Sequence, residues 1–373
     1  MTSFMKVPVN EPLISKEAKQ YVQEAMDTGW LSAAGPCVQK FEEMFAEYIG
    51  VKHAIFVTSG TAALHLALST LDLKAGDEVI VPDFTMIGSI FPIMYTGATP
   101  IFIDVEPDTF NIDVMQLESK ITDKTKAIMP VHIYGHSCDM DPVMEIAQKY
   151  NIAVVEDAAE VHGGTYNGKR CGSIGTINAF SFYGNKIITT GEGGMVCTND
   201  DALATRARSL KDLAHSPEKR FLHTELAFNY RATNLQAAVG LGQMENIDMF
   251  LERKRSMAQK YNTLLADIKG ITLPTTKDYA ENVYWMYALL VNDKLGMTRD
   301  ELCIKLKEKG VDTRDFFLPC HSQPAVQNVF PSTETFPVSE DIANRGFYLP
   351  SGIAITDEQI EYVSDVLHDI ANA

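Results

Sequence analysis

A short apolar run ends in carboxylates in the stretch VVEDAAE, residues 154–160, and similar apolar runs recur on both sides of it. Helix-like stretches separate them, for example residues 61–71 and 141–150. The predicted strands are His53 to Val57, Glu78 to Val81, Thr99 to Asp104, Lys126 to His132, Ile152 to Glu156, Ile177 to Phe182 and Met195 to Thr198. This alternation predicts an α/β unit with a largely parallel sheet covered on both faces, in which ligands collect at the carboxyl ends of the strands.

The pattern changes after about Asn234. The predicted elements that follow are a long helical run over 235–265, a strand over 283–291, a helix over 299–309 and a final helix that begins at the capping box TDEQ, residues 356–359. We therefore expect two domains: residues 1–240, an N-terminal arm and a large α/β domain, and residues 241–373, a connecting helix and a small α+β domain. The arm, about 40 residues long, is expected to pack on another surface.

Composition excludes several classes of protein. The 373 residues are 46% hydrophobic and carry a formal net charge of −17, which is unfavourable for nonspecific binding of nucleic acid. No stretch reaches the roughly 20 apolar residues of a membrane span, and the first residues lack a secretory signal, so we expect a cytoplasmic protein. The six cysteines are scattered without a Cys-x-x-Cys pair or a Cys/His cluster, so we expect free thiols and no metal site.

Three features carry candidate chemistry. The stretch TSGT, residues 58–61, lies between an apolar strand and an apolar helix, where backbone amides and hydroxyls bind phosphate well. It does not match the GxxxxGK[ST] pattern, so ATP is not implied. The acidic end of residues 154–160 offers a partly desolvated carboxylate that requires a cationic partner. Lys186 follows a further apolar strand and is surrounded by small and hydroxyl residues.

Each feature alone also has an ordinary structural explanation: a helix cap for residues 58–61, a structural aspartate for Asp157 and a surface charge for Lys186. Together, in this order along one α/β domain, they are what a pyridoxal 5'-phosphate (PLP) enzyme requires. The amine forms a Schiff base, the carboxylate keeps the ring nitrogen protonated, and the phosphate is anchored so that the reacting carbon is fixed.

The same motifs carry a family resemblance that covers nearly the whole chain. They are TSGTAALH at 58–65, GDEVIVP at 76–82, EDAAE at 156–160, GNK at 184–186 continuing to Gly194, and NYR at 229–231 with NLQAA at 234–238. The chain resembles the DegT-type sugar aminotransferases among the fold type I PLP enzymes. The resemblance implies an aspartate aminotransferase-like fold, with a large domain built on a mostly parallel seven-stranded sheet and a smaller α+β C-terminal domain.

The resemblance also implies roles for individual residues. Lys186 would be the Schiff-base lysine and the acid/base, Asp157 would pair with the pyridinium nitrogen, and Glu160 would lie near the ring hydroxyl. The phosphate would be held by a further set: Gly60, Thr61, Ser181 and, from a second subunit, Asn229. A homodimer with a shared active site is therefore expected. Met86 departs from the family pattern, because relatives place an aromatic residue there to stack on the pyridine ring; a thioether can also pack on a ring face.

The implied activity is transfer of the amino group of L-glutamate, which leaves as 2-oxoglutarate, to a nucleotide-linked 4-keto-6-deoxy sugar, for a surface polysaccharide such as an O-antigen. Arg231, Arg314 and His321 are candidate substrate contacts, and each has an ordinary surface or packing role as its alternative. Other functions stay open: an aminotransferase acting on a UDP- or dTDP-linked sugar or an 8-keto sugar acid, a PLP-dependent sugar dehydratase, and, least favoured, a sensor without enzymatic activity. Some dehydratase relatives replace the lysine with histidine, so Lys186 argues against that branch.

Overall fold

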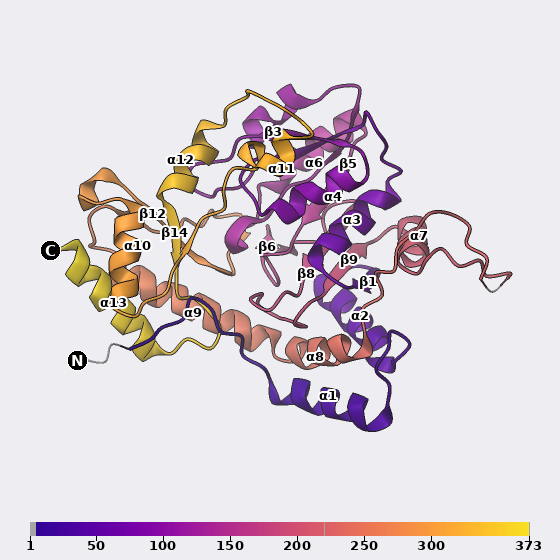
Figure 1. The fold of residues 1–373 in the computed structure, drawn as a ribbon, viewed down its shortest axis with the longest axis horizontal. Coiled ribbons are helices and arrows are strands. Elements are labelled where there is room, and N and C mark those ends of the chain that lie inside the picture. The colour runs from indigo at the N-terminus through magenta and orange to yellow at the C-terminus, as the bar shows by residue number, and fades with distance from the viewer. Residues whose placement is uncertain (1–4, 220, 373) are drawn as a thin grey trace.

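The computed structural model describes residues 5–219 and 221–372. Its main element is a sheet of seven strands, which lies among helices in the large part of the molecule (Figure 1). The strand order is β1 (His53–Val57), β9 (Gly194–Thr198), β8 (Ile177–Ser181), β5 (Ala153–Asp157), β4 (Thr125–Ile128), β2 (Glu78–Pro82) and β3 (Thr99–Ile103). Only β9 runs against its neighbours, so β1 and β8 point the same way as the parallel strands. The seven predicted strands and the mostly parallel sheet are confirmed.

Helices cover both faces of this sheet, because alternate strand residues are apolar on each side. One face packs against α3 (Gly60–Thr70), α4 (Ile90–Tyr95) and α7 (Asp201–Lys211). The other face packs against α2 (Pro36–Ile49), α6 (Met140–Tyr150) and α8 (Asn234–Met244). In β1, for example, Ile55 joins the first core and Phe56 the second.

A second sheet of four antiparallel strands follows in the C-terminal part of the chain. Its order is β10 (Ile271–Thr272), β12 (Tyr287–Val291), β14 (Gly346–Leu349) and β13 (Arg314–Asp315). It shares a separate apolar core with α9 (Ile247–Leu265), α10 (Arg299–Glu308) and α13 (Asp357–Ala371). The capping box predicted for the final helix is present, with Thr356 and Gln359 exchanging hydrogen bonds. The division into domains at residue 240 stays a prediction.

Shorter elements complete the fold. Within the described part of the chain they are the helices α1 (Lys16–Thr28), α5 (Val114–Leu117), α11 (Pro324–Gln327) and α12 (Pro337–Arg345), five 3-10 turns that include η1 (Ile87–Ser89), and the small sheet β11 (Ala280–Glu281), β6 (Thr165–Tyr166) and β7 (Lys169–Arg170). Among the described residues, no helix is long and apolar enough to cross a membrane. None of the six cysteines forms a disulfide.

The prediction of one continuous helix over 235–265 is wrong. The structure breaks it between α8 and α9, where Asn246 has φ −118° and ψ 9°. The side-chain nitrogen of Asn246, Nδ2, donates to the carbonyl of Gly242 at 2.9 Å and to Glu17 Oε2 at 3.1 Å. An asparagine side chain that bonds the backbone competes with the helical ladder, and apolar periodicity does not report this.

The N-terminal arm lies against two parts of its own chain. Val7 forms a parallel bridge with Val311 beside the C-terminal sheet, and α1 packs along α8 (Figure 1). Gly242 makes the second contact possible, since a Cβ there would come within 2.0 Å of the Ala18 amide nitrogen. The arm thus spans the molecule from the C-terminal core to the helices beneath the large sheet.

Candidate active site

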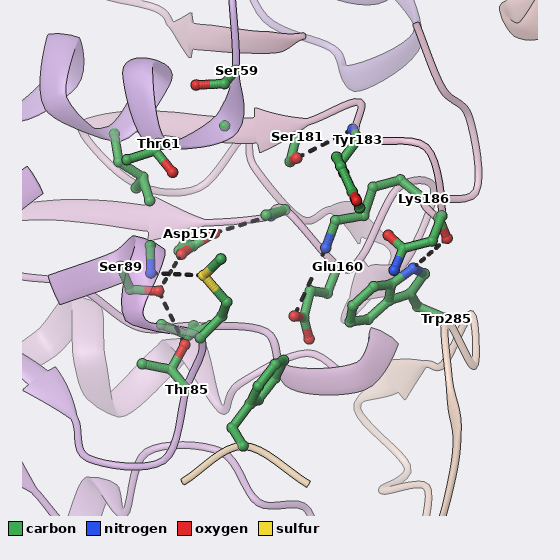
Figure 2. Close-up of a pocket in the computed structure, with 18 of the residues that line it drawn as sticks. Ser59, Thr61, Thr85, Ser89, Asp157, Glu160, Ser181, Tyr183, Lys186 and Trp285 are labelled. Atoms are coloured by element: carbon green, nitrogen blue, oxygen red, sulfur yellow. Dashed lines mark hydrogen bonds and ion pairs between the residues drawn. The ribbon is translucent and has the colours of Figure 1, made fainter. Parts of the chain in front are cut away.

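A cavity of about 410 Å³ opens at the carboxyl edge of the large sheet (Figure 2). The segments after β1, β2, β5 and β8 all contribute to it, because these four strands point the same way. Trp285, Phe317 and Tyr348 close it from the C-terminal part of the chain. The cavity lining brings together seven of the predicted site residues: Gly60, Thr61, Met86, Asp157, Glu160, Ser181 and Lys186.

The start of α3 forms one wall of the cavity. Ser59 caps the helix, its Oγ accepting from the Ala62 amide at 3.1 Å, so the first amides of α3 face the space beside Ser181. A Cβ on Gly60 would lie 2.6 Å from Ser181 Cβ and 2.9 Å from Ser181 Oγ. Only glycine therefore allows the helix to begin this close to β8, and the resulting wall of amides and hydroxyls suits a phosphate.

Asp157 is the last residue of β5 and is buried beneath the cavity. Its Oδ2 accepts from Ser89 Oγ at 2.7 Å, and its Oδ1 accepts from the Ala159 amide at 3.1 Å. Thr85 Oγ1 lies 3.0 Å from Ser89 Oγ and extends this network. Burial raises the pKa of Asp157, while the hydrogen bond from Ser89 opposes that rise. Such a carboxylate is stabilised as an anion by a cationic ring nitrogen.

Lys186 lies in the loop after β8, and its amine points into the cavity (Figure 2). Its Nζ is 3.8 Å from Glu160 Oε1 and 3.6 Å from the centre of the Trp285 ring. Burial lowers the pKa of Lys186, and Glu160 and Asp157 oppose this shift. A desolvated amine of this kind is readily deprotonated, which a nucleophile and proton carrier requires.

The Glu160 carboxylate is held by the backbone of Tyr134, which has an unusual conformation. The Tyr134 amide donates to Glu160 Oε2 at 2.7 Å, and Tyr134, itself buried, has φ 53° and ψ 12°. A left-handed conformation is uncommon for a bulky residue and marks a site held by its surroundings. Burial raises the pKa of Glu160 to about 7, and the charge of Lys186 opposes that rise.

The third carboxylate of the acidic stretch, Glu156, has a structural role. It accepts from the amides of Gly172, Ile174 and Gly175 at 2.6 to 2.7 Å, and from His132 Nε2 at 3.0 Å. Burial acts to raise the pKa of Glu156, but His132 and these amides hold it below its usual value. Glu156 therefore holds the 172–175 loop behind the sheet rather than facing the cavity.

The remaining predicted residues lie outside the lining of this cavity. Asn229 is exposed, and its Oδ1 accepts from Arg231 Nε at 3.0 Å, while Arg231 also pairs with Asp212 at 2.9 Å. Arg314 is exposed in β13, opposite Tyr348. His321 Nδ1 lies 2.8 Å from Asp83 Oδ2, and its backbone amide donates to Asp83 Oδ1 at 2.7 Å. Within one chain these residues do not meet Lys186, and their substrate or cofactor roles stay predictions.

Several residues of the site were not identified from the sequence, among them Ser89, Tyr134, Trp285 and the buried His162. Ser89 and Asp157 are 68 residues apart, so no local pattern links them. Neither ring nitrogen of His162 has a hydrogen-bond partner among the described residues, and burial lowers its pKa to about 3. Trp285 carried one signal, since it is one of only two tryptophans in the chain.

The cavity fits PLP on structural grounds. Its wall at Gly60 is a cradle that one added Cβ would fill, a buried carboxylate lies at Asp157, and a buried amine lies at Lys186. Met86 lies in the lining and is 48% exposed as a residue, and its sulfur accepts from the Gly88 amide at 2.7 Å. No cluster of metal-binding side chains occurs in the part of the chain that the structure describes.

Fold and site together define a PLP-dependent aminotransferase of fold type I, and comparison with known proteins agrees. Residues 12–368 match the DegT/DnrJ/EryC1/StrS aminotransferase family. The chain is 42% identical to the GDP-perosamine synthase of Caulobacter vibrioides, over 99% of this chain and all of that protein, and 42% identical to the GDP-perosamine synthase of Escherichia coli O157:H7, over 97% and 98%. The solved structure of S. venezuelae DesV, in complex with a ketimine intermediate, superposes with a TM-score of 0.90 at 35% identity, covering 96% and 95% of the two chains. The chain belongs to the DegT/DnrJ/EryC1/StrS family of sugar aminotransferases, and PLP is its cofactor.

Proposed function

We propose that this enzyme transfers the amino group of L-glutamate to C4 of GDP-4-keto-6-deoxymannose, making GDP-perosamine. The observation that carries the choice of sugar is the 42% identity to the Caulobacter vibrioides GDP-perosamine synthase over the full length of both chains. The observation that carries the chemistry is the Lys186 amine, held between Glu160 and Trp285 in the cavity that also contains Asp157. We place the reaction in the cytoplasm.

Each residue of the cavity has a separate role in binding the cofactor or in moving a proton. When bound, PLP supplies the electrophilic carbon that carries the amino group and a ring that takes up electrons. Lys186 Nζ would move the proton between the substrate carbon and the carbon that PLP supplies, as its low-dielectric surroundings favour. Asp157, supported by Ser89, holds a proton on the ring nitrogen. Gly60, Thr61 and Ser181 bind the phosphate, and Met86 packs on the ring face.

We further propose that the enzyme works as a homodimer in which Asn229 completes the partner's phosphate site. Asn229 is exposed and lies outside the cavity lining of its own chain, which supports this role. Large apolar side chains are exposed nearby in the same loop, Phe221, Leu222 and Leu226, and at the end of α1, Met26 and Trp30. Exposed apolar groups of this size are typical of surfaces that a second chain covers.

The experiment that tests the activity is a panel of GDP-, UDP- and dTDP-linked keto sugars incubated with 15N-labelled glutamate. We expect label on the sugar with the GDP-linked 4-keto substrate, and no transfer by Lys186→Ala, which should still bind the cofactor. Transfer only to another sugar would correct the substrate. Release of ammonia or water without labelled amino sugar would indicate a dehydratase. A purified protein that develops no visible cofactor band on adding PLP would overturn the whole proposal.

A further inference from the structure

A second lysine is buried behind the site. Lys254, on α9, is only 2% exposed, and burial lowers its pKa to about 7. Its Nζ donates to the carbonyl of Trp285 at 2.9 Å and to the carbonyl of Ser351. No carboxylate among the described residues lies within ion-pair distance of it. Burying a lysine is expensive, so its two carbonyl bonds point to a specific task.

That task concerns Trp285, which is held at two points. Lys254 Nζ donates to the backbone carbonyl of Trp285. The indole Nε1 of Trp285 donates at 2.8 Å to the carbonyl of Asn185, the residue before Lys186 in the chain. The ring face is thereby fixed 3.6 Å from the Lys186 amine (Figure 2). A small space beside Trp285 is lined by Lys254, Asn185, Lys186 and the arm residues 10–12, so the two lysines lie close to the same tryptophan.

We propose that Trp285 is a positioning residue that holds the free amine of Lys186 against its indole face, and that Lys254 keeps the indole in place. This inference rests on the role proposed for Lys186. During transfer of the amino group Lys186 is released from the cofactor, and a flexible four-carbon chain needs a defined location from which to move a proton. The indole face is the negative end of the ring quadrupole and holds an ammonium there without an ion pair.

The indole has a measurable consequence for proton affinity. A cation over an aromatic face is favoured over the neutral amine, so Trp285 raises the proton affinity of Lys186 against the effect of burial. The groups whose charges interact with Lys186 are Glu160, Asp157 and His162. The other titratable residues around it are Tyr183, Glu192 and Tyr348 in the cavity lining and Glu11 and Lys254 in the small space beside Trp285. Because these groups are unchanged when Trp285 is replaced, a shift measured in such a variant reports on the indole.

The first experiment follows the rate at which apo-enzyme takes up PLP, as a function of pH, by the growth of the visible band. Only the neutral amine reacts, so the midpoint of this profile reports the proton affinity of Lys186. We expect Trp285→Leu to move the midpoint down by about 0.5 to 1 pH unit, and Trp285→Phe, which keeps a ring face, to move it less. A midpoint that stays in place, or moves up because water enters, overturns the inference.

The second experiment tests Lys254 through fluorescence. Trp30→Phe leaves Trp285 as the sole tryptophan, since the chain has two. In that background Lys254→Met should shift the emission to longer wavelength and increase quenching by acrylamide. Lys260→Met is the matched control on the same helix, because Lys260 pairs with Glu361 at 2.7 Å and not with Trp285. An unchanged emission in Lys254→Met, with native thermal melting, overturns the role of Lys254.

A double-mutant comparison separates this inference from the proposed function. Any effect of Lys254→Met on the uptake midpoint should vanish in the Trp285→Leu background if Lys254 acts through the indole. An effect of the same size in both backgrounds contradicts that route. The role of Lys186 fails if the wild-type enzyme shows no Schiff-base band, or shows one that Lys186→Ala retains. Only the inference fails if Lys186→Ala abolishes this band but the Trp285 variants leave the midpoint of PLP uptake unchanged.

Discussion

Glu160 and Lys186 share one buried environment, and each alters the protonation of the other. Burial disfavours charge on both, and their proximity, 3.8 Å between Nζ and Oε1, partly restores it. Each carboxylate accepts a hydrogen bond from a backbone amide, and Asp157 differs in accepting a second one from the Ser89 hydroxyl. Two acids of one stretch are thus set to different tasks by their hydrogen-bond partners.

The stability of the apo-enzyme should reflect Glu160. Its pKa is raised from 4.5 to about 7, so between these values the unfolded chain has lost a proton that the folded chain retains. Stability therefore falls as pH rises through this window, by about 1 to 3 kcal/mol. Thermal melting of apo-enzyme across this window should show the loss in the wild type and a flatter profile in Glu160→Gln. Identical slopes would contradict the assignment.

Ser89→Ala should weaken cofactor binding by about tenfold, because it removes a hydrogen bond to a buried charged group. The measurement is titration of apo-enzyme with PLP. Thr85→Val is the matched control: it removes the neighbouring hydroxyl, leaves the bond from Ser89 to Asp157, and should have a smaller effect. Equal losses in the two variants would show that the network, rather than the direct bond, matters.

At the scale of elements, the site depends on where each helix begins. Helix α3 starts at Gly60, against Ser181 of β8. The 3-10 turn η1 ends at Ser89 and places its hydroxyl within hydrogen-bond distance of Asp157, the last residue of β5. Both placements follow from loops at the carboxyl edge of the sheet, where strand ends converge. The break between α8 and α9 is also set by local contacts, since the Asn246 side chain bonds the carbonyl of Gly242 where α8 ends.

Gly60→Ala should selectively reduce affinity for the phosphate, because its Cβ would meet Ser181 at 2.6 Å and displace the start of α3. We expect PLP to lose about tenfold or more in affinity while pyridoxal, which lacks the phosphate, loses little. Gly184→Ala is the control, since its Cβ would meet nothing closer than 3.9 Å. A uniform loss for both ligands would argue against a phosphate cradle at Gly60.

At the scale of the whole molecule, one chain places its own amine, acid and helix start in the cavity, but not Asn229. The arm joins the two halves of the chain, with Val7 beside Val311 and α1 along α8. The proposed dimer would bring the missing asparagine from a second copy.

Mixing two inactive chains tests this arrangement. Lys186→Ala should be inactive and Asn229→Ala strongly impaired when each is expressed alone. When the two variants are co-expressed, about half of the dimers contain one chain of each. One of the two sites in such a dimer has both an intact Lys186 and an intact Asn229. About a quarter of wild-type activity should therefore return. Light scattering should give twice the chain mass. No recovery in a confirmed mixed dimer would place Asn229 in the site of its own chain.

Site residues could be predicted from the sequence where their interaction partners are near in the chain, and could not where the partners are far away. Strand ends, the helix start at Gly60 and the acid at Asp157 were predictable because each is marked by neighbours a few residues away. Ser89 and Trp285 were not, because they reach Asp157 and Lys186 across 68 and about 100 residues. Glu156 shows the same limit, since the sequence places it beside Asp157 but does not say which face it meets.

By itself, the sequence determined the order of strands and helices, the fold class, the family and the chemical set of amine, acid and phosphate wall, because periodicity and motifs are local properties. Only the tertiary structure decided which of these groups meet. It put Asn229, Arg231, Arg314 and His321 outside the cavity lining of one chain. It also placed an indole, held by the buried Lys254, against Lys186. The physical reason is that packing brings together side chains whose separation along the chain leaves no local signature.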